Sequence, residues 1–166
     1  MATNVLNLTK IENQTILTDI TKFNLSEQIR SCVLLLEDKW TQKNLDIDID
    51  FEEHMIFANE ELLKQIWINL LDNAIKFSNT NGKVTIKIAK KHSDIFVSVS
   101  NYGNDIPPEC QSRIFNKFYQ ADESHSLEGN GIGLAICKKV CALHNGEINV
   151  KSQNGLTTFT IKLPEQ

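Results

Sequence analysis

Apolar and polar residues alternate along this chain with two different periods, and each change of period marks the start of a predicted element. From Gln14 to Phe23 threonines interleave with isoleucine and leucine, which is typical of a strand. Asn24 and Glu27 then fit a capping box at the start of a helix. That helix runs for roughly four turns, with apolar residues at Ile29, Val33, Leu36 and Trp40.

The middle of the chain predicts strands around a second, longer helix. Residues 45–51 alternate apolar and acidic side chains, so we expect a strand with one face in water. A short strand follows at 55–58. Asn59 then begins a helix that runs to Phe77, with Glu60 and Glu61 in the first turn, where the helix dipole favours acid.

The last third of the chain predicts two hairpins separated by helices and a polar stretch. The first hairpin covers residues 83–100, and the second covers residues 146–163 and turns at Asn154-Gly155. Between them we expect a short helix from Pro107-Pro108 to near Phe115, a polar lid at 120–129 and a helix at 133–143.

This order of elements predicts an α+β fold rather than a doubly wound sheet. We expect a two-layer sandwich in which a mixed, mostly antiparallel sheet of about five strands carries three main helices on one face. The strict alternation of strand and helix that a doubly wound sheet requires is missing.

Composition limits the chain to one domain and narrows the classes of function. A length of 166 residues with 41% hydrophobic residues suffices for a single core. The net charge of −4 is scattered, which argues against binding to nucleic acid or to an anionic membrane. Four cysteines without a C-x-x-C pair, and an apolar run no longer than Cys32 to Leu36, predict a reduced, cytoplasmic domain.

Asn69, Asn73 and Lys76 fall at i, i+4 and i+7, so they share one edge of the helix at 59–77. Asparagine is a poor residue for a helix interior, so this row needs an explanation. One interpretation is a solvated stripe. The other is a site for a hard cation and a polyphosphate, in which Asn73 offers an oxygen to Mg²⁺. Spacing alone does not separate the two.

A glycine-rich run, Gly129-Asn130-Gly131-Ile132-Gly133-Leu134, leads directly into the helix at 133–143. Glycines let the backbone approach an anion, and a helix N-terminus presents free N–H groups to it. A polar lid precedes the run where a dinucleotide-binding fingerprint needs a strand, and no Walker P-loop occurs.

Two further segments have both an ordinary and a functional interpretation. A predicted strand ends at Asn101 and turns at Gly103, so an acceptor there could reach an adenine amino group, although an ordinary turn explains the same residues. The aromatic cluster at 113–119 is explained by core packing and also by anchoring of the lid.

In their order and spacing, these pieces strongly resemble the catalytic ATP-binding domain of sensor histidine kinases, whose wider superfamily includes gyrase, Hsp90 and MutL. The resemblance covers about residues 24–163, and its most specific stretches are 65–78 and 129–136. It implies the Bergerat fold with an ATP lid. It also implies that residues 14–166 are the catalytic domain and that residues 1–13 are the remnant of a preceding dimerisation helix and linker.

The same resemblance implies a set of site residues. Asn73 would bind Mg²⁺, and Asn69 and Lys76 would line the phosphates of ATP. The remaining nucleotide contacts would come from Phe77, Asn101, Gly103, Asp105, Ile106, Tyr119, His125, Gly129, Asn130, Gly131, Ile132, Gly133, Leu134 and Thr158.

Two departures from the family pattern affect this assignment. The usual turn is Asp-x-Gly-x-Gly, whereas here Asn101 replaces the Asp and Asp105 replaces the second Gly. Asn101 can accept a hydrogen bond without charge assistance, so we expect weaker ATP binding. The lid at 120–128 contains no Arg or Lys, so His125 or Gln120 would have to meet the γ-phosphate.

The resemblance implies transfer of the γ-phosphoryl group to a histidine on a separate dimerisation domain, and then a response regulator as partner. None of the four histidines has the expected acceptor context, so we expect no autophosphorylation by this chain alone. The resemblance also implies a parent kinase that dimerises through separate helices and is anchored in the cell membrane, so we expect this chain by itself to be a monomer. The alternatives are an ATP hydrolase, an anti-sigma-type serine kinase and a degenerate interaction module. Asn69 stands where the hydrolases have a glutamate that acts as general base, and this difference favours a kinase.

Overall fold

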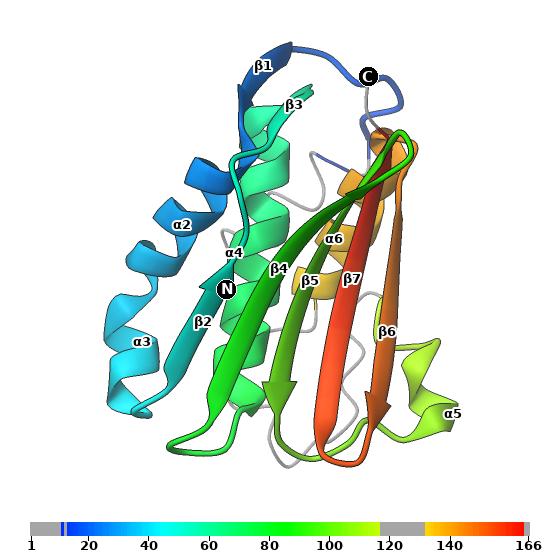
Figure 1. Cartoon of the computed structure of the whole chain (residues 1–166). Helices are drawn as coiled ribbons and strands as arrows, with labels where there is room; N and C mark the ends of the chain where they lie inside the picture. Colours follow the sequence, from blue (N-terminus) through cyan, green and yellow to red (C-terminus); the bar gives the residue numbers. More distant parts are fainter. Residues whose placement is uncertain (1–10, 12, 117–131, 165–166) are drawn as a thin grey trace.

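The computed structural model describes residues 11, 13–116 and 132–164, and these form two layers (Figure 1). The front layer is a five-stranded sheet with the order β2-β4-β5-β7-β6. Its strands are β2 (Asp46–Asp50), β4 (Lys83–Lys91), β5 (Asp94–Tyr102), β6 (Glu147–Gln153) and β7 (Leu156–Pro164). The β2–β4 pair is parallel and the other three pairs are antiparallel, so the predicted mixed, mostly antiparallel sheet is confirmed.

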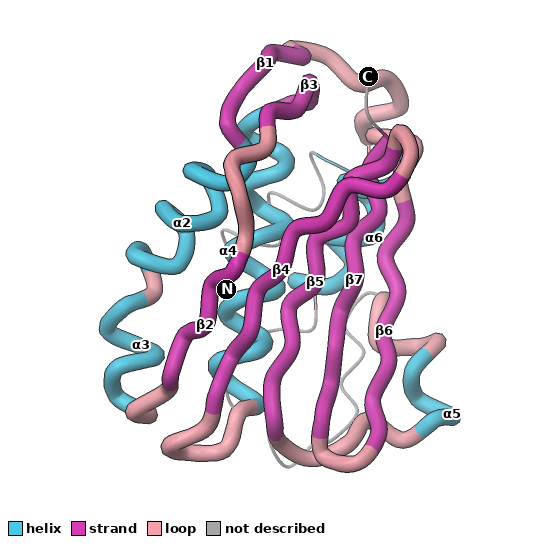
Figure 2. The backbone as a smooth tube through the Cα atoms, in the orientation of Figure 1, coloured by secondary structure: helices cyan, strands magenta, loops and turns pink. Residues whose placement is uncertain are grey.

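The second layer consists of helices that cover one face of this sheet (Figure 2). They are α2 (Leu25–Leu35), α3 (Glu37–Gln42), α4 (Glu60–Phe77) and α6 (Gly133–Leu143), while the short α5 (Pro108–Gln111) lies at the β6 edge. Over the described ranges 11, 13–116 and 132–164, no helix combines the length and apolar character that crossing a membrane requires.

The core lies between the two layers because strand and helix periods both direct apolar side chains there. On β5, Val97 and Val99 are buried while the residues between them are more exposed. On α4 the apolar stripe includes Leu63, Leu70 and the fully buried Trp67. Each large side chain removed from water in this way contributes roughly 1.5–3 kcal/mol before entropy is counted.

Both long N-terminal helices begin at an asparagine, as the sequence predicts. The Asn24 side chain accepts a hydrogen bond from the Glu27 N–H at 3.0 Å at the start of α2. The Asn59 side chain accepts one from the Leu62 N–H, also at 3.0 Å, at the start of α4. Each bond satisfies an N–H group that has no partner within its helix.

The first two predicted elements need correction. The strand expected at 14–23 is β1 (Ile20–Asn24), because Asp19 adopts a positive φ of 53° and interrupts the extended chain before it. The single helix expected through Trp40 is divided at Leu36, whose φ of −101° and ψ of 12° end α2 before α3 begins. The Trp40 indole then donates to the Val33 carbonyl at 3.0 Å, so the apolar spacing continues across the break.

The first strand does not join the main sheet. It pairs antiparallel with β3 (Met55–Asn59) in a separate two-stranded sheet. One face of this ribbon packs on the core through Phe23 and Ile56, whereas Phe57 on the other face is exposed. Of the predicted tail at 8–12, only Ile11 is among the described residues, and it is buried.

Candidate functional site

The predicted polar row lies on a partly buried edge of α4. Asn69, Asn73 and Lys76 are each intermediate in exposure, beside an apolar stripe that is fully buried. The Asn69 amide donates to the Gln65 carbonyl at 2.8 Å, so the preceding turn of the helix holds its orientation. The Lys76 ammonium lies 5.7 Å from the centre of the exposed Phe77 ring.

The start of α6 packs directly against Asn69. A Cβ atom added to Gly133 would lie 3.0 Å from the Asn69 side-chain oxygen, so a glycine allows the closest approach here. Ile132 precedes the helix, is fully buried and provides no side-chain cap. The first turn of α6 therefore brings backbone N–H groups, at the positive end of the helix dipole, to the polar row of α4. Leu134 packs against the core from the same turn.

The turn after β5 packs against the other end of α4. Asn101 is 4% exposed at the end of the strand. A Cβ atom on Gly103 would lie 2.2 Å from the Phe77 carbonyl oxygen, so only glycine fits. The Asn79 N–H donates to the Tyr102 carbonyl at 2.9 Å. The row from Asn69 to Lys76 thus extends between the start of α6 and the Asn101 turn.

Hydrogen bonds fasten this turn to the hairpin between β6 and β7. The Gly103 N–H donates to the Gly155 carbonyl at 2.9 Å, and the Gly155 N–H donates to the Asp105 carboxylate at 2.8 Å. The Ile106 N–H donates to the Ser152 hydroxyl at 2.8 Å. Asp105, which replaces a glycine of the family pattern, therefore helps to hold the turn in place.

Thr158, which the resemblance places among the nucleotide contacts, lies away from this arrangement. Its hydroxyl pairs with that of Ser100 at 2.8 Å, on the face of the sheet away from the helices. Because successive strand residues face opposite sides, the neighbouring Thr157 shares the buried face with Asn101, its partner across β5 and β7. Thr157 also pairs with the Ser152 hydroxyl at 2.7 Å.

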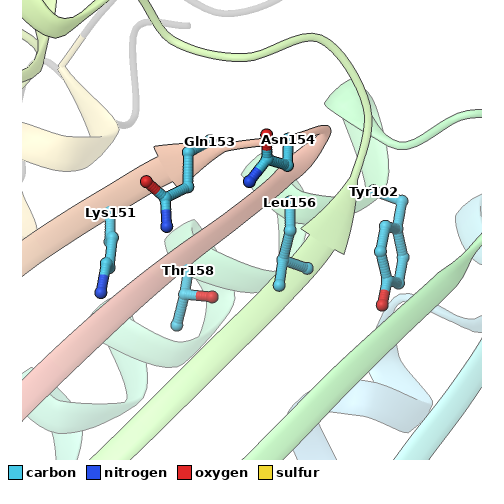
Figure 3. Close-up of a pocket in the computed structure, with 6 residues that line it drawn as sticks. All are labelled: Tyr102, Lys151, Gln153, Asn154, Leu156 and Thr158. Atoms are coloured by element: carbon cyan, nitrogen blue, oxygen red, sulfur yellow. The ribbon is translucent and has the colours of Figure 1, made fainter.

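The open face of the sheet holds a hollow of about 340 Å³, which is separate from the polar row (Figure 3). Thr158 lies in this hollow, on the side of the sheet that the helices leave uncovered. Its other lining residues are Tyr102, Lys151, Gln153, Asn154 and Leu156.

Three cysteine thiols are buried in the core, where burial disfavours their ionised form. Burial raises the pKa of Cys32 to about 11 and that of Cys141 to about 12, and it raises the pKa of Cys137 well above the usual range. Among the described residues no group of His, Cys, Asp and Glu could hold a metal ion. The Asn73 side chain, on the partly buried edge of α4, carries an amide oxygen of the kind that a hard cation binds.

Sequence patterns did not identify two side chains that join distant segments at the two ends of α4. Lys43 follows α3, and its ammonium reaches the carbonyl oxygens at the end of α4. His144 is 3% exposed at the end of α6, and its Nε2 accepts a hydrogen bond from the Asn59 N–H at 3.2 Å. Both contacts join segments far apart in sequence, so no local spacing signals them.

Several predicted site residues lie outside the described part of the chain. They are Tyr119, Gln120, His125, Gly129, Asn130 and Gly131.

The sequence of this chain matches that of a known protein family. The sequence model of the family described as histidine kinase-, DNA gyrase B-, and HSP90-like ATPase matches residues 58–166. Among curated proteins, the heme sensor protein HssS of Staphylococcus aureus strain Newman is 33% identical over 165 residues, covering 99% of this chain and 36% of HssS. The chain therefore spans little more than a third of the length of the curated relatives it matches.

Solved structures give the same result and are matched over a larger share of their own length. The nucleotide-free catalytic domain of histidine kinase ThkA superimposes with a TM-score of 0.81 at 32% identity, covering 89% of this chain and 97% of ThkA's domain. ThkA in complex with the response regulator protein TrrA gives a TM-score of 0.84 at 30% identity, covering 99% of this chain and 47% of that ThkA chain. The chain therefore belongs to the family of histidine kinase-, DNA gyrase B-, and HSP90-like ATPases, as an ATP-binding catalytic domain of the sensor histidine kinase type.

Proposed function

We propose that this domain binds ATP with Mg²⁺ along the polar edge of α4 and donates the γ-phosphoryl group to a histidine on another domain. The observation that carries the proposal is the position of the Asn69–Lys76 row. It extends between the start of α6 and the turn that holds Asn101. The phosphates could thus bind near the start of α6 and the adenine near the Asn101 turn, at the two ends of one helix edge.

The chemistry of the row fits a metal-bound polyphosphate. Asn73 would offer its amide oxygen to Mg²⁺, while Asn69 and Lys76 would face phosphate oxygens. When bound, the metal supplies neutralisation of charge on the phosphates. The first N–H groups of α6, at Gly133 and Leu134, would add donors to the same anion.

The buried Asn101 would read the base. Its amide oxygen can accept a hydrogen bond from an adenine amino group, and its burial strengthens that bond by excluding competing water. Phe77 and Ile106 would border the nucleotide from either side of the Gly103 turn.

The row also favours phosphoryl transfer over hydrolysis. Positioning and charge neutralisation supply most of the catalysis in phosphoryl transfer. An ATPase of this superfamily additionally needs a base that activates water, and Asn69 occupies that position with an amide that cannot take a proton. Transfer to a nucleophile that needs no base to remove a proton before attack, such as the free nitrogen of a neutral imidazole, fits this site better.

We place the acceptor histidine on a dimerisation domain of the parent kinase and the next acceptor on a response regulator. The solved complex of ThkA with the response regulator protein TrrA supports such a partnership. The structure of full-length ShkA in complex with AMPPNP, 25% identical and with a TM-score of 0.87, supports nucleotide binding. We further propose that this domain works in the cytoplasm.

Calorimetry with a non-hydrolysable ATP analogue tests the proposal. We expect binding to the wild type that strengthens with Mg²⁺, and loss of the Mg²⁺ effect in Asn73→Ala. Asn149→Ala, at an exposed asparagine on β6, is the matched control and should bind like the wild type. Absence of binding at millimolar analogue would overturn the proposal and leave an interaction module as the better hypothesis.

A further inference from the structure

A side chain from a distant part of the sequence closes the C-terminal end of α4. The Lys43 Nζ lies 2.9 Å, 2.6 Å and 3.0 Å from the carbonyl oxygens of Ile75, Lys76 and Ser78. The last carbonyls of a helix lack donors within the helix and carry the negative end of its dipole. An ammonium group with its N–H donors is therefore chemically matched to this position.

The backbone around Lys43 is held as firmly as its side chain. The Lys43 carbonyl accepts a hydrogen bond from the Asn81 N–H at 2.8 Å. The next residue, Asn44, donates from its side-chain amide to the Asn81 side-chain oxygen, also at 2.8 Å. The loop after α3 is thus joined to the loop after α4 at Lys43 and Asn44, and the lysine is only partly exposed.

The capped end of α4 packs against the turn that holds Asn101, on the side of the proposed site that would bind adenine. The Phe77 carbonyl oxygen lies where a side chain on Gly103 would begin, and the Asn79 N–H donates to the Tyr102 carbonyl at 2.9 Å. A shift of this last turn would therefore move the Asn101 turn. It would also move Lys76 and Phe77, whose own backbone lies in the capped turn.

We propose that Lys43 is a positioning residue of the nucleotide site, an inference that rests on the proposed function. By binding the carbonyl oxygens of Ile75, Lys76 and Ser78, it fixes the end of α4 and the turn packed against it. Lys43 acts through these carbonyls and does not contact the nucleotide. Its loss therefore weakens ATP binding while the hydrophobic core stays intact.

Lys39 provides a matched control on the same surface. It also reaches α4 with its ammonium, which lies 2.7 Å from the Asp72 carboxylate, but it leaves the carbonyls at the helix end alone. Its side chain is 56% exposed, so this ion pair contributes little to stability.

The test measures the affinity for a non-hydrolysable ATP analogue with Mg²⁺ by calorimetry, together with thermal unfolding. We expect Lys43→Met to weaken binding about tenfold or more, Lys43→Arg to restore most of it, and Lys39→Met to bind like the wild type. If Lys43→Met does not fold, Lys43→Gln takes its place, because its amide keeps donors but shortens their reach. Measurements are made at a temperature at which circular dichroism shows every variant folded.

The outcomes separate this inference from the function on which it rests. If Lys43→Met, or Lys43→Gln in its place, unfolds at a lower temperature but binds like the folded wild type, Lys43 is a helix cap only and the inference is overturned alone. If the wild type binds no analogue at millimolar concentration, the proposed function fails and this inference fails with it. Weakened binding that Lys43→Arg restores supports the inference, since loss of the core would not be rescued.

Discussion

The Asp105 carboxylate accepts a hydrogen bond from the backbone N–H of Gly155 across 2.8 Å. At this position the histidine kinase pattern has a glycine, which has no side chain to make such a bond. The aspartate therefore adds a hydrogen bond between the Asn101 turn and the β6–β7 hairpin. A second hydrogen bond, from the Gly103 N–H to the Gly155 carbonyl, lies beside it.

Asp105→Ala should lower the free energy of unfolding by about 0.5–1 kcal/mol, because it removes one exposed hydrogen bond to the backbone. Asp105→Asn keeps an acceptor oxygen and should lose less. Urea unfolding of the wild type and both variants measures the difference. Equal stability of the wild type and both variants would mean that the hydrogen bond from Gly103 to Gly155 holds the turn by itself.

Asn101→Asp should strengthen binding of an ATP analogue about fivefold, because the proposed hydrogen bond to the adenine amino group would become charge-assisted. The same change buries a carboxylate in the free protein, so the unfolding temperature should fall. Calorimetry with ATP and GTP analogues checks both the gain and its preference for adenine. A gain of the same size for both bases would contradict base reading by residue 101.

Gly133→Ala should weaken nucleotide binding without reducing stability. The added Cβ would meet the Asn69 side-chain oxygen at 3.0 Å and push it from its place. Alanine, however, favours a helix over glycine by up to about 1 kcal/mol. A double-mutant cycle with Asn69→Ala checks the cause, since the binding penalty of Gly133→Ala should shrink when the Asn69 side chain is absent.

The free energy of unfolding should fall as the pH drops below 6.5, the ordinary pKa of histidine, and His144 should account for part of that loss. Its Nε2 accepts from the Asn59 N–H and its Nδ1 lies 2.9 Å from the Val140 carbonyl, which fits the neutral ring. Burial lowers the pKa of His144 below 6.5, although the bond to Val140 raises it in part. The unfolded chain then takes up a proton that the folded one resists, so stability is full above pH 6.5 and declines as the pH falls towards the lowered value.

Thermal unfolding between about pH 7.5 and pH 5.5 measures this slope. His144→Gln should flatten it, whatever that variant's absolute stability. His92→Gln, at an exposed turn, should leave it unchanged. A slope that is the same in all three proteins would assign the pH dependence to other groups.

The four thiols should differ in how fast they react with a disulfide reagent. Cys32, Cys137 and Cys141 are buried with raised pKa values, so little thiolate is available to attack a disulfide reagent. Cys110 is only partly covered. In the native protein an aromatic disulfide reagent should label Cys110 first, and Cys110→Ser should remove that fast phase. All four thiols should react once the chain is unfolded.

Local patterns in the sequence predict most of the fold and one edge of the site. Asn24 and Asn59 are confirmed as helix caps, and the row at Asn69, Asn73 and Lys76 lies on one edge of α4 as its spacing requires. These predictions succeed because each depends on residues a few positions apart in one helix. Alternation also predicts both hairpins, since burial of one sheet face enforces it.

Contacts between distant segments are what the sequence could not predict. Thr158 was expected among the nucleotide contacts, whereas Thr157 is the residue that pairs with Asn101. The sequence does not decide between them, because strand pairing sets the register of β5 and β7 and an offset of one residue reverses the face. Lys43 was missed for a similar reason. A lysine after a helix resembles any solvated lysine until the end of α4 is brought next to it.

The packing of α2 against α4 has a consequence for where this domain can be cut. The family match covers residues 58–166, but Gln28 of α2 accepts a hydrogen bond from the Trp67 indole at 2.7 Å and donates to the Glu60 carbonyl at 2.8 Å. A fragment beginning at residue 58 would retain the row on α4 yet uncover the opposite side of that helix. It would also lack the parallel strand beside β4. The smallest unit that folds is therefore longer than the stretch by which the family is identified.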